Sequence, residues 1–381
     1  MQVSWFDWLV GDTRKPQSLI LFAPQGHGKT SHRIEVARLA RTSAIAPALV
    51  VTLNDVSMLL QSSGEPIDLP EYISILRRLV VIQLWQYVSA HPARLNELRA
   101  HRDAEGRLLA LLHLYAPLYA IDVPGSNINP YIQIFQQRLF GPVEWLKILS
   151  ELASKAGCAS IYVLIDGLDE SDRTRNDPKL MGRILAPLLD APNILQECGF
   201  AFKFFLPATL KNHLLEHNIG RLDRIPYRSL EWEEAQLLQM FSQRLSSYSR
   251  MSETVPLGRV NSFQMLCENE IPYDVDRRLV QAADLSPRTL LDLARQIIEQ
   301  HCTQTNRASD LIQAHTIDKV LFDGGKYSDV TVFEVAGTAD SNEDEPFEPD
   351  NTSALPLLFF NSQTGEVWIG EQKKASKWSS A

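Results

Sequence analysis

A glycine-containing turn between an apolar strand and a helix constrains this chain more than any other feature. The segment SLILF, residues 18–22, predicts a buried strand, and APQGHGKT follows it at 23–30. From about Thr30 onward, apolar residues recur at the spacing of one helix face. In such a strand–turn–helix unit, the backbone amides of the helix N-terminus point beyond the turn, which favours an anion there.

The residues of this turn are those of a phosphate-binding loop, or P-loop. Gly26 and Gly28 permit close approach of the backbone to phosphate oxygens. The ammonium of Lys29 can lie between the β- and γ-phosphates, and the hydroxyl of Thr30 can bind Mg²⁺. The strict pattern has Gly where this chain has Ala23, a mild departure because the cradle uses the later positions. A turn that binds nothing is the alternative for this set of candidate ligand-binding residues: Pro24, Gln25, Gly26, His27, Gly28, Lys29, Thr30 and Ser31.

An apolar strand that ends in carboxylates is the second signal. The segment IYVLID, residues 161–166, predicts a strand with Asp166 at its carboxyl end, which shares a sheet edge with the P-loop if the sheet is parallel. Asp166 and Thr30 are therefore the candidate Mg²⁺ ligands. Asp169 and Glu170 follow within one turn, and one of them could orient or deprotonate an attacking water. The alternative is a turn whose carboxylates only cap the next helix.

Strands and helices alternate along residues 1–232. Apolar segments predict further strands at 47–55, 200–208 and 225–232, and a largely helical block occupies 57–157. This alternation favours an α/β fold with a parallel sheet covered on both faces, a P-loop core over residues 1–232. The helical block is a large insertion in that core. It serves either as a docking surface for a partner or as a bundle that thickens the core.

The rest of the chain follows other patterns. Residues 233–325 are helical in pattern and predict a lid domain, with Ser286 as the N-cap of one helix and Pro287 at its first position. Residues 326–381 contain an acidic linker, a small β hairpin within 358–371 and a short basic tail.

Composition excludes several classes of protein. The formal net charge is -9, so a strongly basic nucleic-acid coat is excluded, although a local basic groove is not. The 4 cysteines are widely spaced, without a C-x-x-C pair, which fits neither a zinc knuckle nor a disulfide scaffold. The longest apolar run, 108–121, is shorter than the roughly 20 residues of a membrane helix. We therefore expect a cytoplasmic protein without a membrane partner.

The pairing of APQGHGKT with a strand ending in DGLDE resembles the STAND and NACHT branch of the P-loop NTPases, close relatives of the AAA+ ATPases. The resemblance spans about residues 15–305, although its specific motifs occupy few of them. It implies an ASCE-type parallel sheet with strand order 5-1-4-3-2 and ATP as the ligand beside Mg²⁺. It also implies assembly into a homo-oligomer with nucleotide, and use as a switch.

Four further residues match the family pattern loosely. Thr209 follows the expected sensor strand, and Arg288 begins a helix at the place of the second sensor, so both are candidate nucleotide contacts. Arg221 and Arg224 in GRLDR resemble the stretch before an arginine finger, which would make them catalytic across a subunit interface. Solvated surface charges are the alternative for all three arginines.

Two functions, and a weaker third, fit these residues. The first is a regulatory ATPase that hydrolyses ATP slowly and controls a separate effector or sensor protein, in prokaryotic signalling or antiviral defence by resemblance. The second is an AAA+ DNA-associated ATPase, a transposition regulator or loader, that assembles on nucleic acid. A scaffold that binds nucleotide without hydrolysing it is the third, and the complete set Lys29, Thr30, Asp166 and Glu170 disfavours it.

Overall fold

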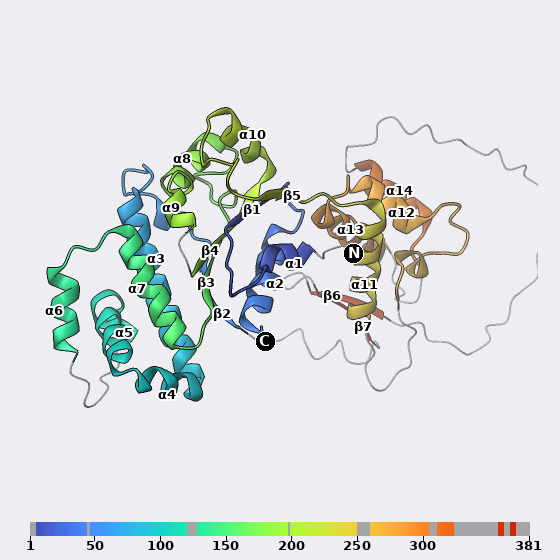
Figure 1. Ribbon diagram of the computed structural model, residues 1–381. Helices are drawn as coiled ribbons and strands as arrows, with labels where there is room; N and C mark the ends of the chain where they lie inside the picture. The colour runs from blue at the N-terminus through green and yellow to red at the C-terminus, as the bar shows by residue number, and fades with distance from the viewer. Residues whose placement is uncertain are drawn as a thin grey trace, which may run out of the picture. The chain divides into compact units, whose positions relative to one another are not determined.

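A computed structural model describes residues 5–43, 46–119, 128–196, 199–249, 260–304, 311–323, 357–361 and 366–370. The chain divides into two compact units, Met1–Glu231 and Trp232–Ala381, which carry separate hydrophobic cores. The elements of both units are labelled in Figure 1. The acidic linker at 339–351 and the basic tail beyond residue 372 lie outside the described residues.

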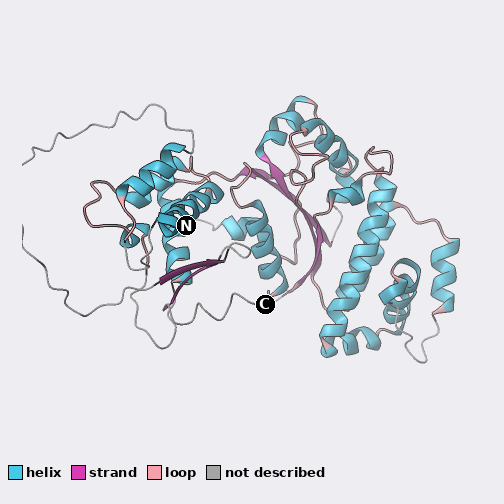
Figure 2. Ribbon diagram, turned by 180° about the vertical axis from the view of Figure 1, so that it is seen from behind, coloured by secondary structure: helices cyan, strands magenta, loops and turns pink. Residues whose placement is uncertain are grey.

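The first unit is built on a parallel sheet of five strands (Figure 2). The spatial order is β2-β3-β4-β1-β5, which confirms the expected order 5-1-4-3-2 read from the other edge. All neighbouring pairs in this sheet are parallel. The chain therefore has the α/β fold of a P-loop NTPase. The strands are β1 Leu19–Ala23, β2 Ala48–Leu53, β3 Ser160–Ile165, β4 Phe200–Pro207 and β5 Tyr227–Ser229.

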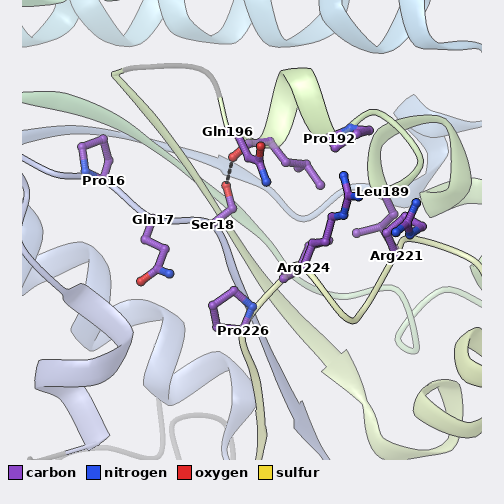
Figure 3. Close-up of a pocket in the computed structure, with 11 residues that line it drawn as sticks. Pro16, Gln17, Ser18, Leu189, Pro192, Gln196, Arg221, Arg224 and Pro226 are labelled. Atoms are coloured by element: carbon purple, nitrogen blue, oxygen red, sulfur yellow. Dashed lines mark hydrogen bonds between the residues drawn. The ribbon is translucent and has the colours of Figure 1, made fainter.

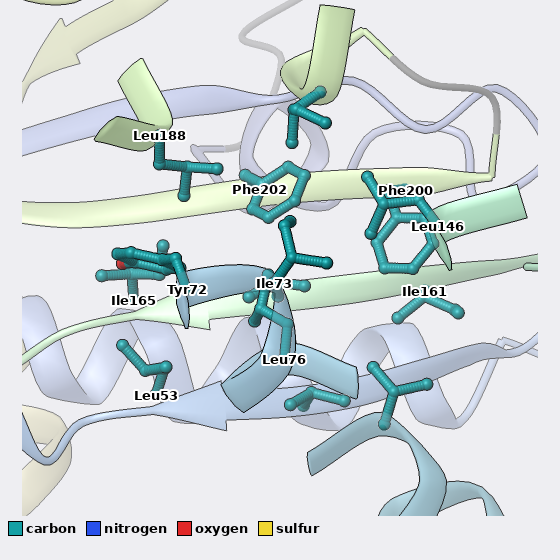
Figure 4. Packing of buried hydrophobic residues seen from close by; sticks show 14 of the residues in the cluster. Leu53, Tyr72, Ile73, Leu76, Leu146, Ile161, Ile165, Leu188, Phe200 and Phe202 are labelled. Carbon is teal, nitrogen blue, oxygen red and sulfur yellow. The ribbon is translucent and has the colours of Figure 1, made fainter. Parts of the chain in front are cut away.

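Apolar residues cover both faces of the sheet because successive side chains of a strand point to opposite sides. On β4, Phe200, Phe202 and Phe204 face the larger core, whereas Ala201 and Phe205 face the smaller one. Figure 4 shows Phe200 and Phe202 packed with Ile161 of β3 and with residues of the covering helices. Strands buried on both faces explain why the sequence shows continuous apolar runs rather than alternation.

Two sets of helices cover these faces. The smaller core contains residues of α1 (Trp5–Val10) and α2 (Lys29–Arg41). The larger core contains residues of α3 (Leu69–Ala90), α7 (Pro142–Lys155), α8 (Pro178–Leu189), α9 (Pro192–Leu195) and α10 (Ala208–Glu216). A capping box at Asp68 and Glu71 marks the start of α3, the longest helix among the described residues.

The block at 57–157 is helical, as its pattern predicts. Its helices α3 and α7 pack against β2 and β3, so they form part of the layer that covers the sheet. Of the other α-helices in the block, α5 (Arg102–Tyr115) and α6 (Asn129–Gln137) lie on the far side of α3 and α7 from the sheet in Figure 1, and α4 (Pro92–Ala100) lies below the lower ends of α3 and α7. The block is thus only partly an addition to the core.

The second unit has its own core, formed by α11 (Glu234–Tyr248), α12 (Val275–Ala282), α13 (Pro287–Gln304) and α14 (Ala314–Asp323). The expected hairpin is present as the antiparallel pair β6 (Leu357–Asn361) and β7 (Glu366–Gly370), while its turn lies outside the described residues. No helix in the described ranges is both long and apolar enough to cross a membrane.

One predicted strand is much shorter than expected. The segment 225–232 forms a strand only at Tyr227–Ser229. At its amino end, the Pro226 carbonyl accepts a hydrogen bond from the Ile20 N–H of β1, but Pro226 has no N–H with which the pairing could continue. At the other end, the Leu230 N–H donates to Phe22 and the chain then leaves the sheet. This edge strand pairs with β1 on one side.

Candidate nucleotide-binding site

The turn after β1 has the backbone geometry of a phosphate cradle. Gly26 and Gly28 adopt φ angles of 85° and 89°, a left-handed conformation that glycine reaches without strain. Helix α2 begins at Lys29, and no side chain of the described residues caps its N-terminus. The amides of its first turn therefore lack an intrahelical acceptor and are available to an anion.

A buried ion pair joins this turn to the turn after β3. The ammonium of Lys29 lies 2.9 Å from Asp169 Oδ2, and the two side chains are only 8% and 12% exposed. The ammonium also lies 3.4 Å from the carbonyl of Ala23, at the end of β1. The structure thus brings Lys29 to the carboxylates that the sequence predicts beside it, at the edge where the parallel strands end.

Asp166 makes a second ion pair between the end of β3 and α2. It follows β3 directly and is 3% exposed, and its Oδ2 accepts a hydrogen bond of 2.9 Å from Nε of Arg33 on α2. Sequence reasoning missed Arg33. Its spacing could have identified it. Arg33 follows Thr30 by three residues and Lys29 by four, and residues at these separations share one face of a helix.

Two carboxylate oxygens in this site have no hydrogen-bond partner within the described part of the chain. Asp166 Oδ1 and Asp169 Oδ1 are buried and accept no hydrogen bond from the described residues. Buried carboxylate oxygens are costly to leave unpaired, so the site is suited to a cation or to the water around one. Within the described ranges, no cluster of three His, Cys, Asp or Glu residues forms a complete metal site.

These features fit Mg²⁺ bound together with a nucleotide. Mg²⁺ is usually held by one or two carboxylates plus phosphate oxygens and waters rather than by a full protein cage. Asp166 supplies the carboxylate, and Thr30 lies on the first turn of α2, partly exposed beside Lys29. The donor set therefore suits the metal that the sequence predicts.

Glu170 and Asp169 differ in their surroundings. Asp169 is buried against Lys29, whereas Glu170 is exposed. The turn that holds both begins at Gly167, whose φ is 81°; a Cβ there would lie 3.0 Å from the Asn54 carbonyl oxygen. The hydroxyl of Thr174 donates to the Leu168 carbonyl and closes the following loop. Glu170 is thus accessible to water, and Asp169 is engaged.

A contact that the sequence analysis did not assign joins His32 to the P-loop. Nδ1 of the buried His32 ring lies 2.9 Å from the Gly28 carbonyl oxygen. The same ring stacks on Phe6 of α1, with 5.2 Å between the ring centroids. Burial lowers the pKa of His32, an effect that the hydrogen bond to Gly28 partly offsets. The ring is therefore neutral at pH 7, and it links α1 to the P-loop.

The other predicted residues lie at three different places. Thr209 is exposed on the first turn of α10, directly after β4, and the neighbouring Pro207 pairs with Ala23 at the P-loop edge. Arg288 is exposed on the first turn of α13 in the second unit. Arg221 and Arg224 precede β5, at the amino end of the sheet.

Both of these arginines line a pocket of about 230 Å³ (Figure 3). Its other lining residues include Ser18, just before β1, and Pro226, just before β5. Five residues of β1 separate this end of the sheet from the P-loop, a rise of roughly 16 Å. Arg221 forms a paired contact with Asp223, with both N–O distances at 3.2 Å. The structure therefore does not bring these arginines to the P-loop of their own chain.

Comparisons with known proteins give no match by sequence and a weak match by structure. No protein-family model matches the sequence, and no curated protein is similar enough to match it. Among solved structures, one match is "Structure of the Aeropyrum Pernix ORC2 protein (ADP form)", with 13% identity and a TM-score of 0.36. The match covers 81% of this chain and 63% of that chain, less than two thirds of it. The P-loop NTPase fold rests on the strand order and on the P-loop turn.

Proposed function

We propose that this chain binds ATP and ADP with Mg²⁺ at the P-loop and hydrolyses ATP. The observation that carries the proposal is the buried contact of Lys29 with Asp169, 140 residues later in the sequence. It joins the ammonium that would bind phosphates to the carboxylates that would hold a metal or a water. A glycine turn that binds nothing has no need of such a charged, desolvated cluster.

Each residue has a distinct task in this proposal. The amides of the first turn of α2 and the Lys29 ammonium bind the phosphates. To do so, Lys29 exchanges its ion pair with Asp169 for a contact with the phosphates. Thr30 and Asp166 hold Mg²⁺, which neutralises phosphate charge when bound. Glu170, exposed and close to this edge, orients the attacking water and accepts its proton. Thr209 and Arg288 are further nucleotide contacts in the proposal.

Calorimetry with the full chain tests binding, and phosphate release tests turnover. We expect ATP and ADP to bind with a stoichiometry of one, more tightly when Mg²⁺ is present. Phosphate release should be slow and should require Mg²⁺. Absence of heat with both nucleotides, in a protein that is folded by circular dichroism, would refute the proposed site. Binding without phosphate release would leave the third reading, a nucleotide-binding scaffold.

The biological role that we propose is a switch that works as a homo-oligomer. Its support is the resemblance to STAND and NACHT proteins together with the position of Arg221 and Arg224 at the end of β1 opposite their own P-loop. In an oligomer the two arginines would contact the nucleotide bound to a neighbouring subunit. The oligomer would control a separate effector or sensor protein, in prokaryotic signalling or antiviral defence. Since ATP and Mg²⁺ are abundant in the cytoplasm, we assign the protein to that compartment.

Mass photometry with ATP, with ADP and without nucleotide tests the switch. We expect a larger assembly with ATP than with ADP. A single mass under all three conditions contradicts nucleotide-driven assembly. An ATP-dependent mobility shift of duplex DNA would instead favour the DNA-associated ATPase.

A further inference from the structure

We infer that Arg33 is a positioning residue that fixes Asp166 so that one carboxylate oxygen is kept for Mg²⁺. The inference rests on the proposed function and deepens it. Arg33 lies one helical turn beyond Thr30, so both residues project from the same face of α2. Its side chain is 14% exposed, and that of Asp166 is 3% exposed, so the pair is shielded from solvent.

The geometry of the pair leaves one oxygen of the Asp166 carboxylate uncovered. Arginine–carboxylate pairs frequently use two parallel N–H···O bonds, which occupy both oxygens. Here Nε of Arg33 bonds Oδ2 at 2.9 Å, and Oδ1 stays buried without a partner among the described residues. A desolvated oxygen left in this way costs free energy, so its placement is explained by a ligand that the site receives.

The neighbouring carboxylate repeats the arrangement. Asp169 Oδ2 accepts a hydrogen bond from Lys29, and Asp169 Oδ1 is buried without a partner among the described residues. Lys29 and Arg33 match the charges of Asp166 and Asp169, and Glu170 adds a further negative charge. The guanidinium of Arg175, which contacts the Glu170 carbonyl, is offset by Asp172 at 3.8 Å. The site therefore retains a net negative charge, which attracts a divalent cation even with both ion pairs intact.

The two basic residues then have different tasks. Lys29 leaves Asp169 for the phosphates, whereas Arg33 stays on Asp166 Oδ2 and keeps Oδ1 in place. Residues that hold a metal ligand by a hydrogen bond typically contribute a factor of about 10–100 to metal affinity. Loss of Arg33 should therefore weaken metal binding without affecting the contacts to the phosphates.

The test measures metal binding directly, with Mn²⁺ as the probe. Electron paramagnetic resonance reports free Mn²⁺ as it is titrated into the full chain saturated with ADP. Arg33→Met removes the donor and keeps the length of the side chain, and Arg33→Lys keeps the charge. Arg38→Met is the matched control, because the exposed Arg38 lies on the same helix and pairs with Glu35 rather than with a residue of the site. Calorimetry of ADP in EDTA gives the metal-free affinity of each variant.

We expect Mn²⁺ affinity in Arg33→Met to fall by about 10–100-fold, with ADP affinity in EDTA within about two-fold of wild type. Arg33→Lys should lose less, and Arg38→Met should match wild type. Unchanged Mn²⁺ affinity in Arg33→Met would make the ion pair merely structural, and tighter affinity would make Arg33 a competitor of the metal. If Arg33→Met does not fold, wild-type affinity in Arg33→Lys overturns the inference. Failure of wild type to bind ADP would refute the proposed function instead.

Discussion

Lys29 and Asp169 form an ion pair of 2.9 Å although β4 lies between the strands that position them. Two strand spacings, roughly 10 Å, separate β1 from β3. The Lys29 ammonium also lies 3.4 Å from the Ala23 carbonyl at the end of β1, so the turn that follows β3 extends toward β1 and brings Asp169 to it. The contact thus depends on the strand order as much as on the P-loop turn.

Replacing Lys29 by Ala should abolish nucleotide binding, because it removes the ammonium from the cradle. It should also destabilise the nucleotide-free protein by about 3 kcal/mol, since Asp169 is then left buried without a counter-charge. Calorimetry and urea unfolding measure the two effects. Adding Asp169→Asn should restore most of the stability and none of the binding. Unchanged ATP affinity in Lys29→Ala would contradict the P-loop assignment.

Replacing Glu170 by Gln should preserve ATP binding and stop hydrolysis, because the amide keeps the shape of the side chain and loses the base. The exposure of Glu170 predicts that stability stays within about 0.5 kcal/mol of wild type. Phosphate release and mass photometry should reveal an assembly locked with ATP. If hydrolysis survives, the base is Asp169, and Asp169→Asn should then abolish turnover.

Replacing both Arg221 and Arg224 by Ala should preserve ATP affinity and lower turnover by about ten-fold or more. The reason is that both arginines lie at the amino end of the sheet, away from their own P-loop. Mixing this variant with Lys29→Ala protein should restore part of the activity, since a wild-type arginine then faces a wild-type P-loop. Normal turnover in the double variant, or turnover independent of protein concentration, would leave the two arginines as surface charges.

Lys203 predicts a pH dependence of stability. Burial lowers the pKa of Lys203 to about 7, and its ammonium has only the Val10 carbonyl at 3.5 Å and the Tyr162 ring at 5.0 Å as neighbours given by the structure. Between pH 7 and about 10.5 the unfolded chain binds this proton and the folded chain does not, so this residue makes stability rise with pH across that window. Below pH 7 the cost of the buried charge is fully present.

Replacing Lys203 by Met should therefore raise the free energy of unfolding at pH 6 by at least about 1 kcal/mol, the equivalent of one pKa unit. The gain should shrink toward pH 10. Urea unfolding at both pH values measures it, with the exposed Lys179→Met as a control that gains nothing. An equal effect of Lys203→Met at pH 6 and pH 10 would exclude titration of this group as the cause.

Replacing Gly167 by Ala should destabilise the protein by at least about 2 kcal/mol, because a positive φ and close contact with the Asn54 carbonyl add together. Gly11 is a matched control: its φ is also positive at 65°, but nothing lies within 4 Å of a Cβ built there. Gly11→Ala should cost only about 1 kcal/mol. Thermal unfolding compares the two variants, and equal losses would show that the contact with Asn54 is unimportant.

The sequence by itself determined the parts of this protein that depend on neighbouring residues. The turn at 23–30, the apolar run that ends at Asp166 and the helical block at 57–157 all carry local patterns, and the structure has the corresponding elements. The strand order was expected from the resemblance carried by two of these patterns. Local periodicity and turn chemistry are written in short segments, so they can be read without the fold.

Only the tertiary structure decided which side chains meet. Arg33 carries no motif, and its contact with Asp166 exists because β3 ends beside the first turns of α2. The shortness of β5 depends on its place at the sheet edge, and the packing of α3 and α7 on β2 and β3 depends on the order of the strands. Contacts between residues more than 130 positions apart form only when the whole sheet is assembled, and no local pattern of residues specifies them.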